Sequence, residues 1–256
     1  MGIVLSKTNY KDFQKYCSKN NTAIIPTGSC EQHGLHLPLG TDFLIAEKIA
    51  EYLVSCTETI LCPTIPYGHS SNHERFPGTV TIDPRNYAYF IQDIIKSLSR
   101  HGIKKIVFIN GHSGNTHLLQ EGCNLLRDQK CIGCIVNWWE LTGILMPEFA
   151  LSGHGDYLEG SAVMALYPND VKASEGKEPA DKFLTNQIKV KNWQKIEFKN
   201  ANIITWVKSE DGSDYGNFGS LKNMTRENGE KVLKSINEFL KDFINEFAKI
   251  DTERLV

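Results

Sequence analysis

The chain has 256 residues and a mass of 28.9 kDa, enough for one large domain, and no Pro/Ser/Gly-rich linker divides residues 1–256. A formal net charge of −2 and a pI near 6.5 argue against a nucleic-acid partner and a polybasic membrane patch. No apolar run approaches the ~18 residues of a membrane span, and seven cysteines without a disulfide spacing favour reduced thiols in a cytoplasmic protein.

In the first hundred residues, short apolar runs typical of strands alternate with segments that have helical periodicity. Residues 22–29 are typical of a buried strand, and residues 42–56 carry apolar side chains at helical spacing. Residues 60–68 predict a second strand. A long loop with a short β segment follows over 69–83, and a helix is predicted over 84–102, with proline at its start and glycine where a C-cap belongs.

The rest of the chain continues the alternation and then becomes polar. Residues 104–111 are the clearest buried strand of parallel type, followed by a helix over 115–129 and a strand over 131–139. Residues 172–203 are polar and Lys-rich, and we expect an irregular excursion there. Residues 226–250 form a strongly amphipathic helix that packs on the sheet.

Repeated strand, loop and helix units predict a single α/β domain with a mainly parallel β-sheet flanked by helices. In such sheets, ligands bind outside the carboxyl ends of the strands. Polar clusters fall at three of these ends: Glu31 and His33, then His69 and His73, then the turn 110–115. The sequence therefore places a functional site at this edge of the sheet.

Carboxylates and imidazoles together suit zinc, manganese or iron. Glu31 and His33 can face the same side of an extended turn, and Asp42 can turn back from the next helix. His112 lies in a glycine-flanked turn, and Glu159 precedes an apolar helical run. Simpler roles are open for two of them: Asp42 as a helix N-cap and Glu31 as the partner of a Lys or Arg. His36 is expected to pack or to support a ligand.

Four blocks of sequence now carry a family resemblance. They are "IPTGSCEQHGLHLPLGTD", "YGHSSNHERFPGT", "INGHSGN" and "GHGDYLEGSAVMALYP", in this order, with an echo in "GNFGSLKNMTRENGE". The chain resembles the creatininase (creatinine amidohydrolase) family from about residue 22 to residue 168. The first block is highly specific for that family.

The resemblance implies a dinuclear metal centre with two divalent ions (Zn, Mn or Fe) per subunit. Its implied ligands are Glu31, His33, Asp42, His112 and Glu159. Asp42 matches the family's bridging carboxylate, and His154 matches the histidine taken as the proton-transfer residue. The resemblance also implies a homo-oligomer, often a hexamer.

Departures from the family pattern argue against creatinine itself as the substrate. Creatininase proper has an acidic metal-site residue where this chain has Gly114. The usual Glu-Thr-Ser is Glu159-Gly160-Ser161 here, and Asp156 stands where glycine is common.

The leading hypothesis is a hydrolase of a non-peptide C–N bond in a cyclic amide, a formamide or a similar small amide. A metal ion makes hydroxide available at neutral pH, and His154 can pass the proton to the departing nitrogen. One alternative is a family-type peptidase acting on a short peptide; another is a metal- or small-ligand-binding protein without catalysis. We expect the substrate to contact Tyr67, Ser70, His73, Ser113 and Trp139. A core position for Trp138 or Trp139 is also open.

Overall fold

A parallel sheet forms the centre of the computed structural model, which describes residues 1–127, 129–149 and 153–255. Its strand order is β1-β3-β2-β4-β5, and every neighbouring pair is parallel. The strands are β1 (Ile3–Val4), β2 (Thr22–Thr27), β3 (Ile60–Leu61), β4 (Lys105–Asn110) and β5 (Ile132–Asn137).

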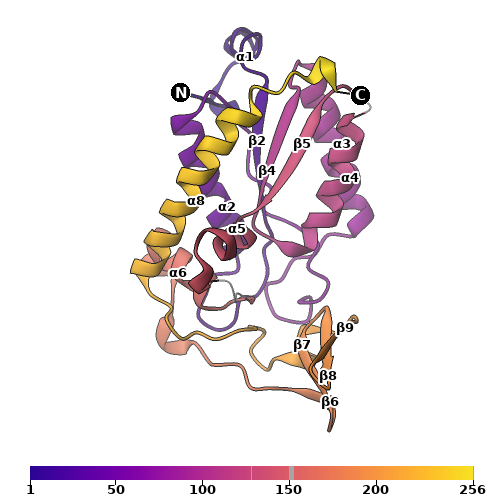
Figure 1. The fold of residues 1–256 in the computed structure, drawn as a ribbon, viewed down its shortest axis with the longest axis vertical. Coiled ribbons are helices and arrows are strands. Elements are labelled where there is room, and N and C mark those ends of the chain that lie inside the picture. The colour runs from indigo at the N-terminus through magenta and orange to yellow at the C-terminus, as the bar shows by residue number, and fades with distance from the viewer. Residues whose placement is uncertain (128, 150–152, 256) are drawn as a thin grey trace.

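Helices cover both faces of this sheet (Figure 1). One apolar core lies beneath α2 (Thr41–Cys56), α5 (Trp138–Leu145), α6 (Tyr157–Leu166) and α8 (Arg226–Phe247). The other lies beneath α3 (Pro84–Arg100) and α4 (Thr116–Arg127), with α1 (Tyr10–Cys17) packed against its edge. This arrangement confirms the predicted α/β class.

Local sequence explains these elements. All six residues of β2 and all six of β4 are buried, as expected for strands covered on both faces. The Asp83 side chain accepts hydrogen bonds from the backbone N–H groups of Arg85 and Asn86, and Pro84 occupies the first helical position of α3. Thr225 caps α8 in the same way through the N–H of Asn228. The starts of α3 and α8 are therefore encoded by the residues immediately around them.

The strand order places a switch point between β2 and β4. The chain leaves β2 through α2 towards β3 on one side, and returns through α3 to β4 on the other. In open α/β sheets a ligand crevice forms where the order reverses, at the carboxyl ends. The α2 N-terminus lies directly against this point, because a Cβ atom at Gly111 would lie 2.1 Å from the backbone oxygen of Asp42.

Two predicted strands are shorter than expected. Within residues 60–68 only Ile60–Leu61 forms a strand, because Pro63 and Pro66 lack the N–H that a ladder needs. Isolated bridges continue the extended segment at Ile65 and Gly68. The strand predicted over 131–139 ends at Asn137, and Trp138 begins α5, a helix that the sequence did not predict.

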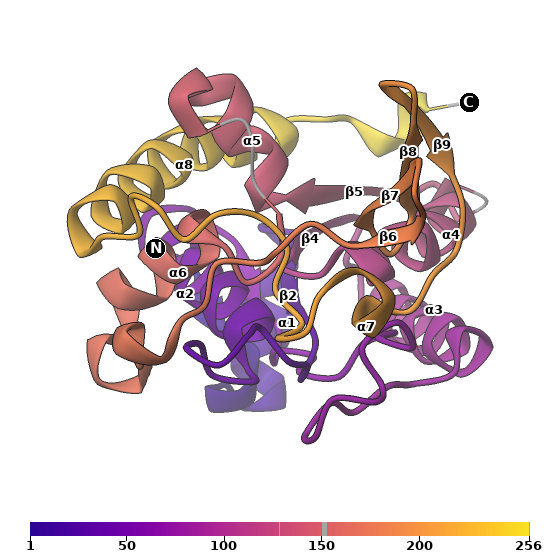
Figure 2. The ribbon, with the colours of Figure 1, turned by 90° about the horizontal axis from the view of Figure 1, so that it is seen from below.

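The prediction of an irregular excursion over 172–203 is wrong. The chain forms a second, antiparallel sheet of β6 (Phe183–Thr185), β7 (Ile188–Asn192), β8 (Lys195–Phe198) and β9 (Ala201–Ile204). The strands are short, and frequent lysines obscured their alternation. Seen from below, this sheet and α7 (Ser209–Gly212) lie over the end of the parallel sheet where its strands finish (Figure 2).

Among the described residues, no helix has the length and apolar character needed to cross a bilayer.

Candidate metal centre

Asp42 lies between two histidines that arrive from different strand ends. Its Oδ1 is 2.9 Å from His33 Nε2, and its Oδ2 is 3.1 Å from His112 Nδ1. His33 follows β2 and His112 follows β4, whereas Asp42 sits in the first turn of α2. One buried carboxylate thus faces two imidazoles with its two separate oxygens.

Two further carboxylates complete the cluster. Glu31 Oε1 is 3.2 Å from His112 Nδ1, and Glu159 Oε2 is 3.7 Å from His33 Nε2. Glu159 is held by the N–H of Gly155, which donates to Oε2 at 2.6 Å. The ligand atoms offered by Glu31, Asp42 and His112 all lie within 4.8 Å of one another. Residues that the sequence separates by up to 128 positions therefore converge at one end of the sheet.

Three histidine rings of the cluster are each held by a backbone carbonyl. Each has one nitrogen against a backbone carbonyl: His33 Nδ1 on Glu31 O at 3.0 Å, His112 Nε2 on His69 O at 2.8 Å, and His154 Nε2 on Gln32 O at 2.7 Å. Since a carbonyl only accepts, each of these nitrogens carries the proton. The other nitrogen then faces the carboxylates, where it can give its lone pair to a metal ion, which is how histidine ligands of metals are oriented.

Electrostatics also fit a cation at this position. Burial disfavours charge on His33, but the carboxylates of Asp42 and Glu159 outweigh it and raise its pKa to about 10. Burial likewise opposes charge on His112, yet Glu31 and Asp42 hold its pKa well above the ordinary value. Burial raises the pKa of Glu159 to about 8. The buried carboxylates thus draw positive charge to the cluster, and a divalent ion can take the place of these protons.

His73 differs from those three rings. Its Nδ1 lies 2.7 Å from Gln32 Nε2 and 2.8 Å from Ser209 Oγ. The amide nitrogen of Gln32 only donates, so Nδ1 accepts and Nε2 carries the proton. That nitrogen faces Glu31 Oε1 at 3.9 Å. His73 therefore offers the cluster a hydrogen-bond donor, whereas His154 offers a lone pair at Nδ1, 3.7 Å from Glu31 Oε1.

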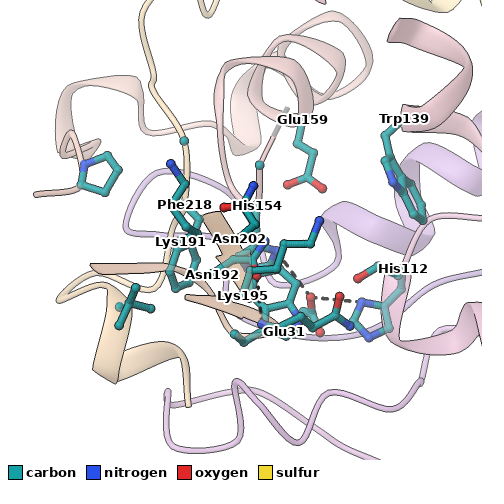
Figure 3. Close-up of a pocket in the computed structure, with 18 of the residues that line it drawn as sticks. Glu31, His112, Trp139, His154, Glu159, Lys191, Asn192, Lys195, Asn202 and Phe218 are labelled. Carbon is teal, nitrogen blue, oxygen red and sulfur yellow. Dashed lines mark hydrogen bonds and ion pairs between the residues drawn. The ribbon is translucent and has the colours of Figure 1, made fainter. Parts of the chain in front are cut away.

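A cavity of about 640 Å³ opens over the cluster. Ser113 and Trp139 line it, as expected for substrate-contacting residues, together with Glu31, Asp42, His112, His154 and Glu159. Figure 3 shows Trp139 on one side of this cavity and Lys191, Asn192 and Asn202 on the other.

Three expected substrate contacts need correction, because Tyr67, Ser70 and His73 do not line this cavity. Ser70 and His73 are 2% and 1% exposed. Ser70 Oγ lies 3.3 Å from His112 Nε2, so it supports a candidate ligand from behind. Tyr67 lines a separate apolar cavity beside α3. Trp138, by contrast with Trp139, is 1% exposed and belongs to the core.

The simpler roles considered for the acidic residues are not observed. The N-cap of α2 is Gly40, and no side chain in the described part of the chain caps this helix, so Asp42 is free to face the histidines. Among the described residues, the ion-pair partners of Glu31 are His73, His112 and His154, and none is a lysine or arginine. His36 is 1% exposed, and burial together with the charge of His33 lowers its pKa to about 4.

Sequence reasoning missed three residues around the cluster. The Gln32 amide nitrogen donates to His73 Nδ1 and to the carbonyl of Gly216, and the Gln32 backbone carbonyl accepts from His154 Nε2. Trp193 packs edge-on against His73 and His154, with ring centroids 4.9 and 5.4 Å apart, and against Phe218. Gln32 stands inside the first motif block, which was a usable signal. Trp193 and Phe218 reach the cluster only through long-range packing, so no local pattern marked them.

Gly114 offers a direct test of the histidine geometry. A Cβ atom at this position would lie 2.3 Å from His69 O and 2.5 Å from His112 Nε2, so no side chain fits without breaking the bond between them. We expect Gly114→Ala to lower metal affinity roughly 10–100-fold, the usual cost of losing a group that orients a ligand. Ser113→Ala, one residue away, should keep wild-type affinity. Metal titration of both folded variants measures this, and equal affinities would contradict it.

A parallel α/β sheet whose strand ends hold a shared carboxylate between two histidines has the arrangement of a metal-dependent hydrolase. The chain belongs to the creatininase family, because the sequence model described as creatinine amidohydrolase matches residues 6–244. The family is one of metal-dependent amidohydrolases, which agrees with the resemblance read from the four motif blocks.

Individual relatives differ in what they act on. The creatinine amidohydrolase of Pseudomonas putida is 27% identical over 189 residues, which cover 65% of this chain and 73% of that protein. A mycofactocin precursor peptide peptidase of Mycolicibacterium smegmatis is 34% identical over 158 residues, covering 59% and 60%. A 3-dehydro-scyllo-inosose hydrolase of Thermotoga maritima is 28% identical over 112 residues, covering 43% and 36%.

Solved structures show the same fold at lower identity. A creatininase with manganese aligns with a TM-score of 0.79 at 23% identity, over 98% of this chain and all of that one. A zinc–zinc form of a creatininase mutant aligns at 0.78 with 23% identity and the same coverage. These likenesses concern the backbone and confirm the fold class.

Proposed function

We propose that this protein is a metal-dependent amidohydrolase that cleaves a non-peptide C–N bond in a cyclic amide, a formamide or a similar small amide. The observation that carries the proposal is Asp42, which faces His33 with one oxygen and His112 with the other. Two divalent ions would share this carboxylate, one held with Glu31 and His112 and the other with His33 and Glu159. Zinc and manganese, the metals named for the solved relatives, both suit this donor set, as does iron.

When bound, such ions lower the pKa of water towards neutrality and polarise the attacked carbonyl. The chain's own residues would do the rest. His154 presents an unprotonated Nδ1 to the cluster because its Nε2 proton is engaged by Gln32 O. In the proposed reaction Nδ1 takes the proton of the attacking water and delivers it to the departing nitrogen. Trp139 and Ser113 line the cavity and would restrict how the substrate sits.

A short peptide is the second candidate substrate. Two observations favour it: the cavity of about 640 Å³ exceeds what a single small ring requires, and one relative is a peptide peptidase at 34% identity. The chemistry at the metal centre would be the same. A homo-oligomer, a hexamer by family resemblance, and a cytoplasmic location remain predictions.

Metal removal and substrate profiling test the proposal together. At a free metal concentration of 100 times Kd, bound metal stabilises the folded state by about 2.7 kcal/mol, so a chelator should lower the melting temperature by roughly 5–10 °C. The metal-loaded protein should hydrolyse at least one member of a panel of cyclic amides, formamides and short peptides, with creatinine included. The chelated protein and Asp42→Ala serve as inactive controls. If the protein binds metal but hydrolyses no member of the panel, the result would favour a metal- or small-ligand-binding protein without catalysis.

A further inference from the structure

The outer wall of the cavity carries lysines that the proposed chemistry does not use. Lys189 and Lys191 project from β7 and Lys195 begins β8, and all three line the cavity. We call these three residues the lysine wall. Trp193 lies in the turn between β7 and β8, next to the lysine wall. Its ring centroid is 5.4 Å from that of His154, so the wall is close to the metal cluster. A substrate bound at the metal centre therefore has the lysine wall within reach.

The charges of this wall are incompletely balanced. Lys189 Nζ lies 2.6 Å from Asp181 and Lys191 Nζ lies 3.1 Å from Glu197. Within the described part of the chain, Lys195 has no carboxylate within 4 Å of its ammonium group. Of the two paired acids, only Asp181 itself lines the cavity. The three carboxylates at the inner end, Glu31, Asp42 and Glu159, are committed to the metal ions in the proposed reaction.

Neutral side chains on the same wall add hydrogen-bond donors. Asn192 ends β7, Gln194 lies in the turn after it, and Asn202 of β9 also lines the cavity. Figure 3 shows Lys191, Asn192 and Asn202 grouped across the cavity from Trp139. Ammonium and amide N–H groups that converge on one surface are suited to a carboxylate, whose oxygens only accept.

We propose that the lysine wall is a subsite for an anionic group, so that the preferred substrates are amides carrying a carboxylate beyond the Trp193 ring. N-acyl amino acids and short peptides with a free terminal carboxylate belong to this class. The inference rests on the proposed function and narrows its substrate. It also gives a physical reason to expect discrimination against neutral creatinine, which has no anionic group for the wall to bind.

Binding of a matched pair tests the subsite without requiring turnover. N-benzoylglycine and N-benzoylglycinamide share the phenyl ring and the amide but differ in the terminal carboxylate. Calorimetric titration of the metal-loaded protein at low ionic strength should show the acid bound about tenfold more tightly, since a few partly exposed ion pairs each contribute a small factor. The preference should shrink in high salt, as expected for solvent-exposed charges.

Two variants with the same net charge test whether the preference for the acid comes from the lysine wall. Lys191→Gln/Lys195→Gln should reduce the preference to within about twofold, because the remaining Lys189 is paired with Asp181. Lys199→Gln/Lys249→Gln removes the same net charge outside the cavity lining and should keep the tenfold preference. Melting curves should show both variants folded.

Three outcomes would overturn the inference. The wild-type protein could show no preference, including the case in which neither compound binds. The preference could survive in Lys191→Gln/Lys195→Gln, which would assign the carboxylate to the metal ions. Lys199→Gln/Lys249→Gln could lose the preference equally, which would assign the preference to the net charge of the protein. If the protein hydrolyses neutral amides but shows no preference for the acid, the subsite is refuted and the proposed function is retained. If it prefers the acid but hydrolyses no amide, the proposed function is refuted and the subsite is retained.

Discussion

Replacing Asp42 by alanine is expected to remove bound metal almost completely, whereas His36→Ala should retain it. Asp42 touches the imidazoles of both candidate half-sites, at 2.9 Å and 3.1 Å, so its loss removes a ligand from each ion at once. It also removes the negative charge that offsets the repulsion between two cations. Because loss of a merely orienting group costs 10–100-fold in metal affinity, we expect Asp42→Ala to exceed about 100-fold.

His36 is the matched control for this experiment. It stands in the loop that leads into α2 and is equally buried, but its ring nitrogens form no hydrogen bond to the cluster carboxylates among the described residues. His36→Ala should lower stability by a modest amount and leave the metal stoichiometry unchanged. Elemental analysis of the two folded variants measures their metal content. Asp42→Asn serves as an isosteric third variant. Equal metal content in Asp42→Ala and His36→Ala would refute a bridging role for Asp42.

His154→Ala is expected to keep its metal and lose about 10²–10⁴-fold in kcat, the range for a positioned acid–base group. The bond from His154 Nε2 to Gln32 O directs Nδ1 towards Glu31, and this nitrogen lies 3.7 Å from the carboxylate oxygen. A proton held there can reach both the attacking water and the departing nitrogen. Metal stoichiometry and kcat must be measured on the same preparation, with a substrate identified by the panel.

Two different results would reject this role. Near-normal kcat per folded molecule would mean that His154 only packs against the rings of His73 and Trp193. Loss of metal would make His154 a ligand, which its spacing allows, because His33, His154 and Glu159 offer ligand atoms within 4.8 Å of one another. His154→Gln helps to separate the two, since an amide can hydrogen-bond in the loop but cannot shuttle a proton.

Local sequence patterns were sufficient to predict the parallel arrangement of the sheet and the helices α2, α3, α4 and α8, but they missed β1, α1 and α5. Buried strands such as 22–27 and 105–110 are continuous apolar runs because helices cover both faces, and a run of that kind is visible without any tertiary information. Both ends of α3 were equally predictable, from Pro84 at its start and Gly102 after its end. Where backbone chemistry interrupts the pattern, as at Pro63 and Pro66, the predicted strand was too long.

The candidate ligands could also be named from the sequence, since four of the five stand in two motif blocks that follow adjacent strands. The parallel topology brings those strand ends together, so proximity in space follows from the order of elements. The distances and ring orientations do not follow from it. They depend on which nitrogen each histidine commits to a carbonyl, such as His112 Nε2 to His69 O, and only the packed structure decides this.

The substrate side of the cavity was decided by tertiary structure alone. Trp138 and Trp139 are neighbours in sequence, yet one enters the core and the other faces the cavity because α5 turns them to different sides. Tyr67 follows the same strand as Ser70 but faces another cavity. Trp193 and the lysine wall come from a segment that lies more than 30 residues from His154 along the chain. Hydrophobic periodicity records which face of an element is buried, whereas contacts between distant elements depend on how two sheets pack, and no local pattern encodes that packing.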